Sequence, residues 1–192
     1  MITSKKELRY YLLQDQRANH LSTDKIMRFF PPCYATIKAT CLMRKAEYYL
    51  GTGRVLLGKI YAKRMKRFCR KLGMELSVNV FGPGLRIAHP FGIVVTGRAK
   101  IGCNCFLHQG VTIGTNENEK GAPCIGDNFV AGAGAKIIGD VSIADGVCVG
   151  ANAVVVKSIN TPNSTWGGVP AKQISDNSSK CYLSPYLFRD QK

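Results

Sequence analysis

The sequence has few acidic residues, only three histidines and no long apolar run. Twelve Asp and Glu stand against 27 Lys and Arg, which gives a formal net charge of +15. No uninterrupted apolar stretch reaches the roughly 18 residues of a membrane span, and residues 1–20 contain no apolar core of signal-peptide length. The charge favours anionic partners. We therefore expect a cytoplasmic protein, either free or in peripheral contact with the inner face of the membrane.

Several motifs that would assign chemistry directly are also missing. The eight cysteines have irregular spacings and form no C-x-x-C pair, so neither a disulfide framework nor a zinc site is indicated, and no metal is predicted. There is no G-x-S-x-G element and no cysteine with an evident histidine partner, which leaves a covalent acyl-enzyme without support. No nucleic-acid-binding motif is present either.

A six-residue repeat runs along the second half of the chain. Three hexapeptides would close one turn of roughly 18 residues, with rungs about 4.8 Å apart. A period of six fits neither a helix nor a single amphipathic strand. The repeat predicts a mainly β fold, a parallel β-helix. The aliphatic positions are Phe81, Ile87, Val95, Ile101, Leu107, Ile113, Ile125, Ala131, Ile137, Ile143, Val149 and Val155.

The repeat has two irregularities, a slip of two residues after Ile87 and a break at residues 115–124. The break is rich in Asn, Glu, Gly and Pro, which is typical of a loop that projects from a corner. Such a loop could reach a neighbouring site or could simply be solvated. We place the β-helix at residues 74–160 and a C-terminal tail at residues 161–192.

Residues 1–73 differ in kind and predict a basic N-terminal α-helical region. Helices are expected at residues 34–50 and 54–72, and a weaker one at 4–16. The stretch from Arg54 to Lys71 holds eight basic residues and no acidic one. It is either a solvated helix that covers the end of the β-helix or a contact for a membrane surface or an anionic carrier.

Two histidines, His89 and His108, lie in the repeat one turn apart once the slip is allowed for. They should therefore project from one face on adjacent rungs. A neutral imidazole can act as general base in acyl transfer. The alternative is that either is merely a surface or corner histidine; metal binding is less favoured because no third ligand is evident.

Residues 74–174 resemble the hexapeptide-repeat O-acetyltransferases of the serine acetyltransferase branch, which includes enzymes that acetylate capsule and O-antigen sugars. The matching strings are IAHPFGIVV, LHQGVTIGT, PCIGDNFVAGAGAKIIGDVSIADGVCVGANAVVVKSI and, in the tail, GGVPAKQI. The resemblance implies a left-handed β-helix that assembles as a homotrimer, with acetyl-CoA in the groove between subunits. It places His89 on the catalytic base and Ala133, Ala151, Lys157 and Lys172 near the cofactor, although both lysines could equally be solvated.

Two departures bear on the acceptor. The aspartate that orients the base in serine acetyltransferases falls at Met74, with Glu75 the nearest carboxylate, and a second histidine that helps hold the amino acid is replaced within residues 121–123. His108, by contrast, occurs in the polysaccharide-modifying relatives. We therefore expect transfer from acetyl-CoA to a sugar hydroxyl, free or carrier-linked, in surface polysaccharide biosynthesis. The alternatives are a serine O-acetyltransferase and a non-catalytic β-helix scaffold.

Overall fold

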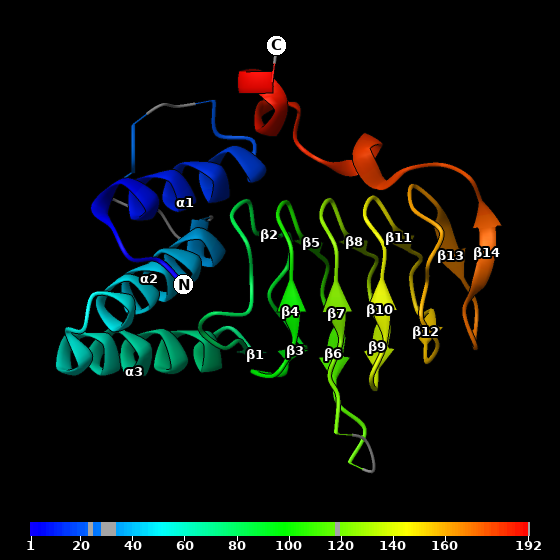
Figure 1. Cartoon of the computed structure of the whole chain (residues 1–192), viewed down its shortest axis with the longest axis horizontal. Helices are drawn as coiled ribbons and strands as arrows, with labels where there is room; N and C mark the ends of the chain where they lie inside the picture. Colours follow the sequence, from blue (N-terminus) through cyan, green and yellow to red (C-terminus); the bar gives the residue numbers. More distant parts are fainter. Residues whose placement is uncertain (23–24, 28–33, 118–119, 192) are drawn as a thin grey trace.

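A computed structural model describes residues 1–22, 25–27, 34–117 and 120–191, with side chains through residue 188. Three helices lie at one end of a coil of short strands (Figure 1). They are α1 (Lys5–Ala18), α2 (Ala35–Gly51) and α3 (Val55–Lys71). All three lie where the sequence predicts helices.

Local sequence explains where the helices begin and which faces they bury. The Ser4 hydroxyl accepts a hydrogen bond from the Glu7 amide, and the Glu7 carboxylate accepts one from the Ser4 amide, so a capping box starts α1. Helix α3 buries Gly58, Met65 and Cys69, whose spacings of seven and four residues place them on one helical face. Its other side faces away from the molecule.

The strands form three parallel sheets that wrap around one axis. Sheet A has the order β1-β3-β6-β9-β12, sheet B has β10-β7-β4, and sheet C has β14-β13-β11-β8-β5-β2. Only the pairing of β13 with β14 is antiparallel. The strands are β1 (Met74–Glu75), β2 (Arg86–Ile87), β3 (Ile93–Val95), β4 (Lys100–Ile101), β5 (Phe106–Leu107), β6 (Thr112–Gly114), β7 (Cys124–Ile125), β8 (Val130–Ala131), β9 (Lys136–Ile138), β10 (Ser142–Ile143), β11 (Cys148–Val149), β12 (Val154–Val155), β13 (Thr165–Gly167) and β14 (Lys172–Ser175).

The register confirms the six-residue repeat. Ile125 pairs with Ile143, eighteen positions later, which is one turn of three hexapeptides. Ile113 pairs with Ile137, twenty-four positions later, because the loop at residues 115–124 adds six residues to that turn. Every aliphatic residue of the series is buried in one core inside the coil. The strands also continue beyond the expected end at residue 160, since β13 pairs in parallel with β11.

The turns that lead from sheet C to sheet A, which we call the C–A corner, require a left-handed backbone. Gly92, Gly110, Gly134 and Asn152 occupy successive rungs at this corner, and all have φ between 55° and 73°. Glycine and asparagine adopt this conformation at least cost. A Cβ on Gly110 would also lie 3.4 Å from the Cα of Gly134, so the rungs stack closely here.

A buried ionic cluster joins the helices to the coil. Arg44 of α2 is fully buried and pairs with Asp15 of α1 at 2.9 Å and with Glu47 at 3.0 Å. Asp15 also accepts hydrogen bonds from the amides of Gly84 and Leu85, both at 2.9 Å. One guanidinium and one carboxylate thus fix two helices against the first turn of the coil.

The C-terminal segment runs back from β14 along the coil to α1 (Figure 1). Leu183 and Leu187 pack on the outer face of sheet C, against Phe106, Val130 and Cys148. These strand residues therefore are buried although they point away from the core. Sheet C has both faces covered along this stretch.

Within the described residues, none of the helices has both the length and the apolar character needed to cross a bilayer. The seven described cysteines are free thiols. The remaining one, Cys33, lies outside the described residues.

Candidate active site

The two-residue slip lies in the C–A corner itself. Ile87 pairs with Leu107, twenty positions later, whereas the Phe91 carbonyl accepts a hydrogen bond from Gly110, which follows Gln109. Gln109 is therefore the rung partner of Phe91 at a spacing of eighteen. The two extra residues fall between Ala88 and Phe91, so the His89–Pro90 pair bulges from the corner. The irregularity in the repeat exposes His89.

His108 lies at the same corner on the next rung. Its amide donates to the Ala131 carbonyl at 3.1 Å, and its ring packs against Phe106 with centroids 4.4 Å apart. Partial burial, and to a lesser extent the proximity of Arg86 and His89, lower the pKa of His108. The Ala88 amide donates to the Leu107 carbonyl at 3.1 Å, so His89 and His108 follow paired residues on adjacent rungs, as their spacing predicts. His108 is a neutral imidazole at physiological pH.

No carboxylate supports His89 in the part of the chain that the structure describes. Met74 is buried in the coil core. Glu75 is exposed on β1 and pairs with Val94 of sheet A, without a hydrogen bond to His89. The carboxylate–histidine pair of the resembling enzymes therefore has no counterpart among the described side chains.

The two predicted cofactor alanines lie further along the same corner. The Gln109 carbonyl accepts from Gly134, and the Ala133 carbonyl accepts from Asn152, both at 2.8 Å. Ala133 and Ala151 thus follow Phe91 and Gln109 on successive rungs. A side chain larger than alanine would narrow the surface at these points, so an extended ligand can approach the backbone closely.

Lys157 and Lys172 come together at the C-terminal end of the coil, Lys157 on the turn that follows β12 of sheet A and Lys172 at the start of β14. Both line a pocket of about 290 Å³ with Trp166 and Pro170. In sheet C, four rung spacings separate β2, next to His89, from β13, which corresponds to about 19 Å. The coil therefore has two lysines at its C-terminal end and two imidazoles at the corner of its first turns. This arrangement suits an elongated ligand with phosphates at one end and a reacting group at the other.

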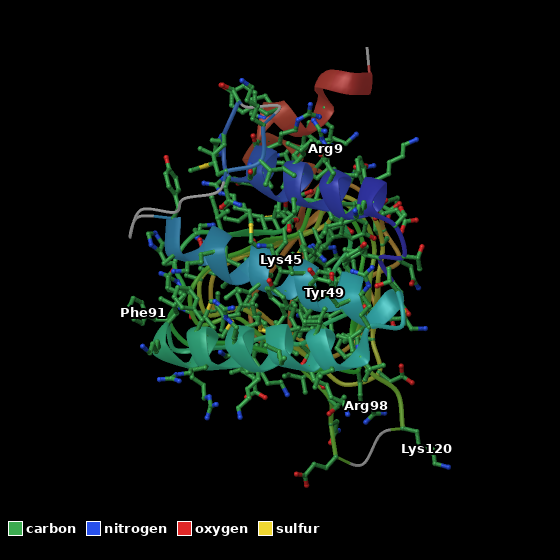
Figure 2. The ribbon with its side chains drawn as sticks, turned by 90° about the vertical axis from the view of Figure 1, so that its left-hand side faces the viewer. Arg9, Lys45, Tyr49, Phe91, Arg98 and Lys120 are labelled. Carbon is green, nitrogen blue, oxygen red and sulfur yellow. The ribbon has the colours of Figure 1, made fainter. Side chains whose placement is uncertain are left out.

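Sequence reasoning missed several residues near the histidines. The Arg86 guanidinium lies over the Phe106 ring at 4.1 Å and contributes charge to the site. The third histidine, His20, lies directly after α1, and burial together with Arg86 lowers its pKa. Phe91 is 68% exposed at the corner (Figure 2). The repeat carried a signal for Arg86 and Phe91, which flank the slip, but none for His20.

The loop at residues 115–124 starts from another corner, between sheets A and B. Its described parts project from the coil, and Arg98 donates a hydrogen bond to the Lys120 carbonyl at its base. Figure 2 shows Arg98 and Lys120 on the opposite side of the molecule from Phe91. The loop does not approach the histidines of its own chain.

The described side chains include no set of metal ligands. No three His, Cys, Asp or Glu residues gather there in the manner of a metal site. The two corner histidines are the titratable groups that the corner offers for proton transfer.

The fold and the corner define a hexapeptide-repeat protein built on a left-handed parallel β-helix, with an N-terminal helical region, which confirms the predicted fold class. No family model matches the chain. It is 33% identical over 149 residues to a serine acetyltransferase from Mycobacterium tuberculosis, covering 76% of this chain and 63% of that protein. It is 41% identical over 96 residues to one from Helicobacter pylori, covering 49% and 56% respectively. The chain thus spans less than two thirds of these relatives' length.

Solved structures agree. Serine acetyltransferase from Brucella abortus superposes with a TM-score of 0.71 at 25% identity, over 91% of this chain and 72% of that one. The soybean apoenzyme gives 0.70 at 28%, over 88% and 70%. The Brucella abortus enzyme in complex with coenzyme A gives 0.66 at 26%, over 89% and 67%. The chain is thus similar in sequence and in fold to serine acetyltransferases. None of these names points to capsule or O-antigen enzymes.

Proposed function

We propose that this protein is an acetyl-CoA-dependent O-acetyltransferase of the serine acetyltransferase type. The observation that carries the proposal is the arrangement along the coil, with His89 and His108 at the C–A corner of its first turns and Lys157 and Lys172 at its C-terminal end, four rung spacings or about 19 Å along the axis. Acetyl-CoA is an elongated molecule with phosphates at one end and a thioester at the other. The sequence relatives and the structural neighbour that holds coenzyme A support the same cofactor.

In this proposal His89 is the general base. Its imidazole takes the proton from the acceptor hydroxyl as the oxygen attacks the thioester carbonyl carbon. The tetrahedral intermediate collapses with loss of the coenzyme A thiolate, which receives the proton from the imidazolium. The products are the acetyl ester and free coenzyme A. His108, kept neutral by burial and by Arg86 and His89, is available as a second hydrogen-bonding group on the acceptor.

Serine is the acceptor that the relatives favour, because each of those described above carries the name serine acetyltransferase. The sugar hydroxyl predicted from the sequence finds no support among them. It is retained as a second candidate because Glu75 makes no hydrogen bond to His89, and because residues 121–123 lack the histidine that helps hold the amino acid. An acceptor of different shape would account for both departures.

We also propose a homotrimer with the sites between subunits. Phe91, Val169 and Ile174 lie exposed at or just beyond the C–A corner, at 68%, 72% and 66%. Exposed apolar side chains along one edge are typical of an interface. The described parts of the loop at residues 115–124 project away from the coil, and in this proposal they extend toward a neighbouring copy.

Release of the free thiol of coenzyme A tests the proposal. Purified protein is assayed with acetyl-CoA and either L-serine or a panel of monosaccharides and nucleotide sugars. The same assay on His89→Ala should show a loss of kcat of roughly 10²- to 10⁴-fold, whereas the control Lys5→Ala, which changes an exposed residue of α1, should retain activity. Turnover of sugars but not serine would select the second candidate. Full activity in His89→Ala would remove the base assignment, and no transfer to any acceptor would favour a scaffold.

A further inference from the structure

The outer face of α3 is strongly basic and is also partly apolar. Leu56 is 74% exposed and Ile60, one helical turn later, is 45% exposed. Val55 and Leu57 are 49% and 41% exposed beside them. Large aliphatic side chains in this state form a contiguous apolar patch at the N-terminal end of the helix. We call this patch and the basic residues after it the α3 face.

The rest of the α3 face carries one sign of charge. Helix α3 contains seven lysines and arginines, all exposed, and no acidic residue. In the described part of the chain, no ion pair involves any of them. Nitrogen-tipped side chains extend from α3 away from the rest of the molecule (Figure 2). The seven are Lys59, Lys63, Arg64, Lys66, Arg67, Arg70 and Lys71.

The opposite side of α3 fixes the orientation of this face. Gly58 packs so closely on α2 that a Cβ there would lie 2.6 Å from the Leu50 side chain. Met65 and Cys69 are buried in the same core as the coil. The helix therefore cannot roll to hide its apolar patch, and Leu56 and Ile60 stay exposed.

We propose that the α3 face docks on the surface of a membrane that contains anionic lipids. Lys and Arg near such a surface are attracted to the lipid headgroups, and exposed aliphatic side chains next to them can enter the boundary between headgroups and acyl chains. The α3 face supplies both elements on a rigid helix. No ordering of the chain is needed before it binds.

Charge argues against the other occupants of this face. A second copy of the chain packed symmetrically on it would bring seven cations against seven, at a cost in repulsion. A nucleic acid would use the cations but would leave Leu56 and Ile60 without a role. An anionic lipid surface is the partner that accounts for the charge and the apolar patch together.

Sedimentation with lipid vesicles tests the proposal. The full chain is mixed with vesicles of phosphatidylcholine alone or of phosphatidylcholine with phosphatidylglycerol, at low and at physiological salt. Binding is expected to the anionic vesicles and to weaken as salt rises. Two double variants separate the contributions, Leu56→Ser with Ile60→Ser and Lys63→Glu with Arg67→Glu. Each should lower the partition coefficient roughly tenfold or more.

Matched variants elsewhere provide the controls. Lys5→Glu with Lys6→Glu changes two exposed lysines on α1, and Val156→Ser removes an exposed apolar side chain after β12. Both should bind vesicles as the wild type does, and circular dichroism should show an unchanged fold in all variants.

Three results would overturn the proposal. The first is equal binding to neutral and anionic vesicles, or equal losses in the controls. The second is self-association that the α3 variants abolish while vesicle binding is absent, which would make this face an interface between copies. The third is tight binding to RNA that ignores the serine substitutions, without vesicle binding.

Discussion

Replacement of Arg44 by methionine should destabilise the whole molecule although the residue lies outside the candidate site. The guanidinium pairs with Asp15 and Glu47. It also donates to the carbonyls of Phe81 at 2.8 Å and Gly82 at 2.6 Å. Methionine fills a similar volume but satisfies none of these acceptors. Two buried carboxylates would lose their cation.

The size of the effect follows from this geometry. Removal of one partner from a buried ionic cluster costs about 3–5 kcal/mol, because the remaining charges stay desolvated. Domains of this kind have a total unfolding free energy of about 5–15 kcal/mol. Arg44→Lys should lie between the wild type and methionine, since lysine keeps the charge but lacks the planar fork that reaches both carboxylates.

Urea denaturation at a fixed protein concentration measures the change, because association would otherwise shift the apparent stability. The control is Arg9→Met, which alters an exposed arginine of α1 (Figure 2) and should stay within about 0.5 kcal/mol of the wild type. A free energy of unfolding for Arg44→Met within 1 kcal/mol of the wild type, on the order of the scatter among surface variants, would refute the reasoning. It would mean that water or local rearrangement compensates the carboxylates.

Three further predictions concern the candidate site and the coil that carries it. Lys157→Ala combined with Lys172→Ala should raise KM for acetyl-CoA severalfold and leave kcat unchanged, and an unchanged KM would remove both from the cofactor site. Burial, Arg86 and His89 lower the pKa of His108 in the folded protein below its ordinary value of 6.5. The unfolded chain therefore binds a proton at His108 more readily, and the free energy of unfolding should fall as pH drops below about 6.5. Arg86→Met should raise that pKa in an NMR titration; no movement would exclude the charge effect. Gly134→Ala should cost about 1–3 kcal/mol in urea denaturation, because φ is +73° there, and a wild-type midpoint would contradict the left-handed requirement.

The six-residue repeat explains why much of the fold could be predicted from the sequence. A β-helix repeats one local rule, so the aliphatic residues from Phe81 to Val155 each carry the same signal, and all are buried as expected. The N-terminal helices were predictable for a similar reason, since amphipathic spacing and the Ser4 capping box are local. The C-terminal end of the coil could not be predicted in this way. Strand β13 follows a shortened stretch at residues 156–164, in which Ile159 pairs with Ile143 at a spacing of sixteen, and this irregularity hides the pairing of β13 with β11.

The candidate site was predictable only in part. The spacing of His89 and His108 predicts their common corner because the rung is a fixed number of residues. Arg86 shows the limit of this reasoning, since its stacking on Phe106 and its effect on two histidines depend on side-chain packing. The absence of a carboxylate at His89 is another such case. Glu75 is next in sequence to Met74, where the carboxylate was expected, but it lies on β1 of sheet A and pairs with Val94.

The sequence alone thus determines the six-residue coil, the three helices and the corner on which the histidines lie, because each of these follows from periodicity along the chain. Only the tertiary structure decided how the pieces meet. Arg44 reaches Asp15 and the turn at Phe81 across long separations in sequence, and Leu183 and Leu187 return to cover sheet C. Such contacts depend on shape and charge in three dimensions, and no spacing in the sequence predicts them.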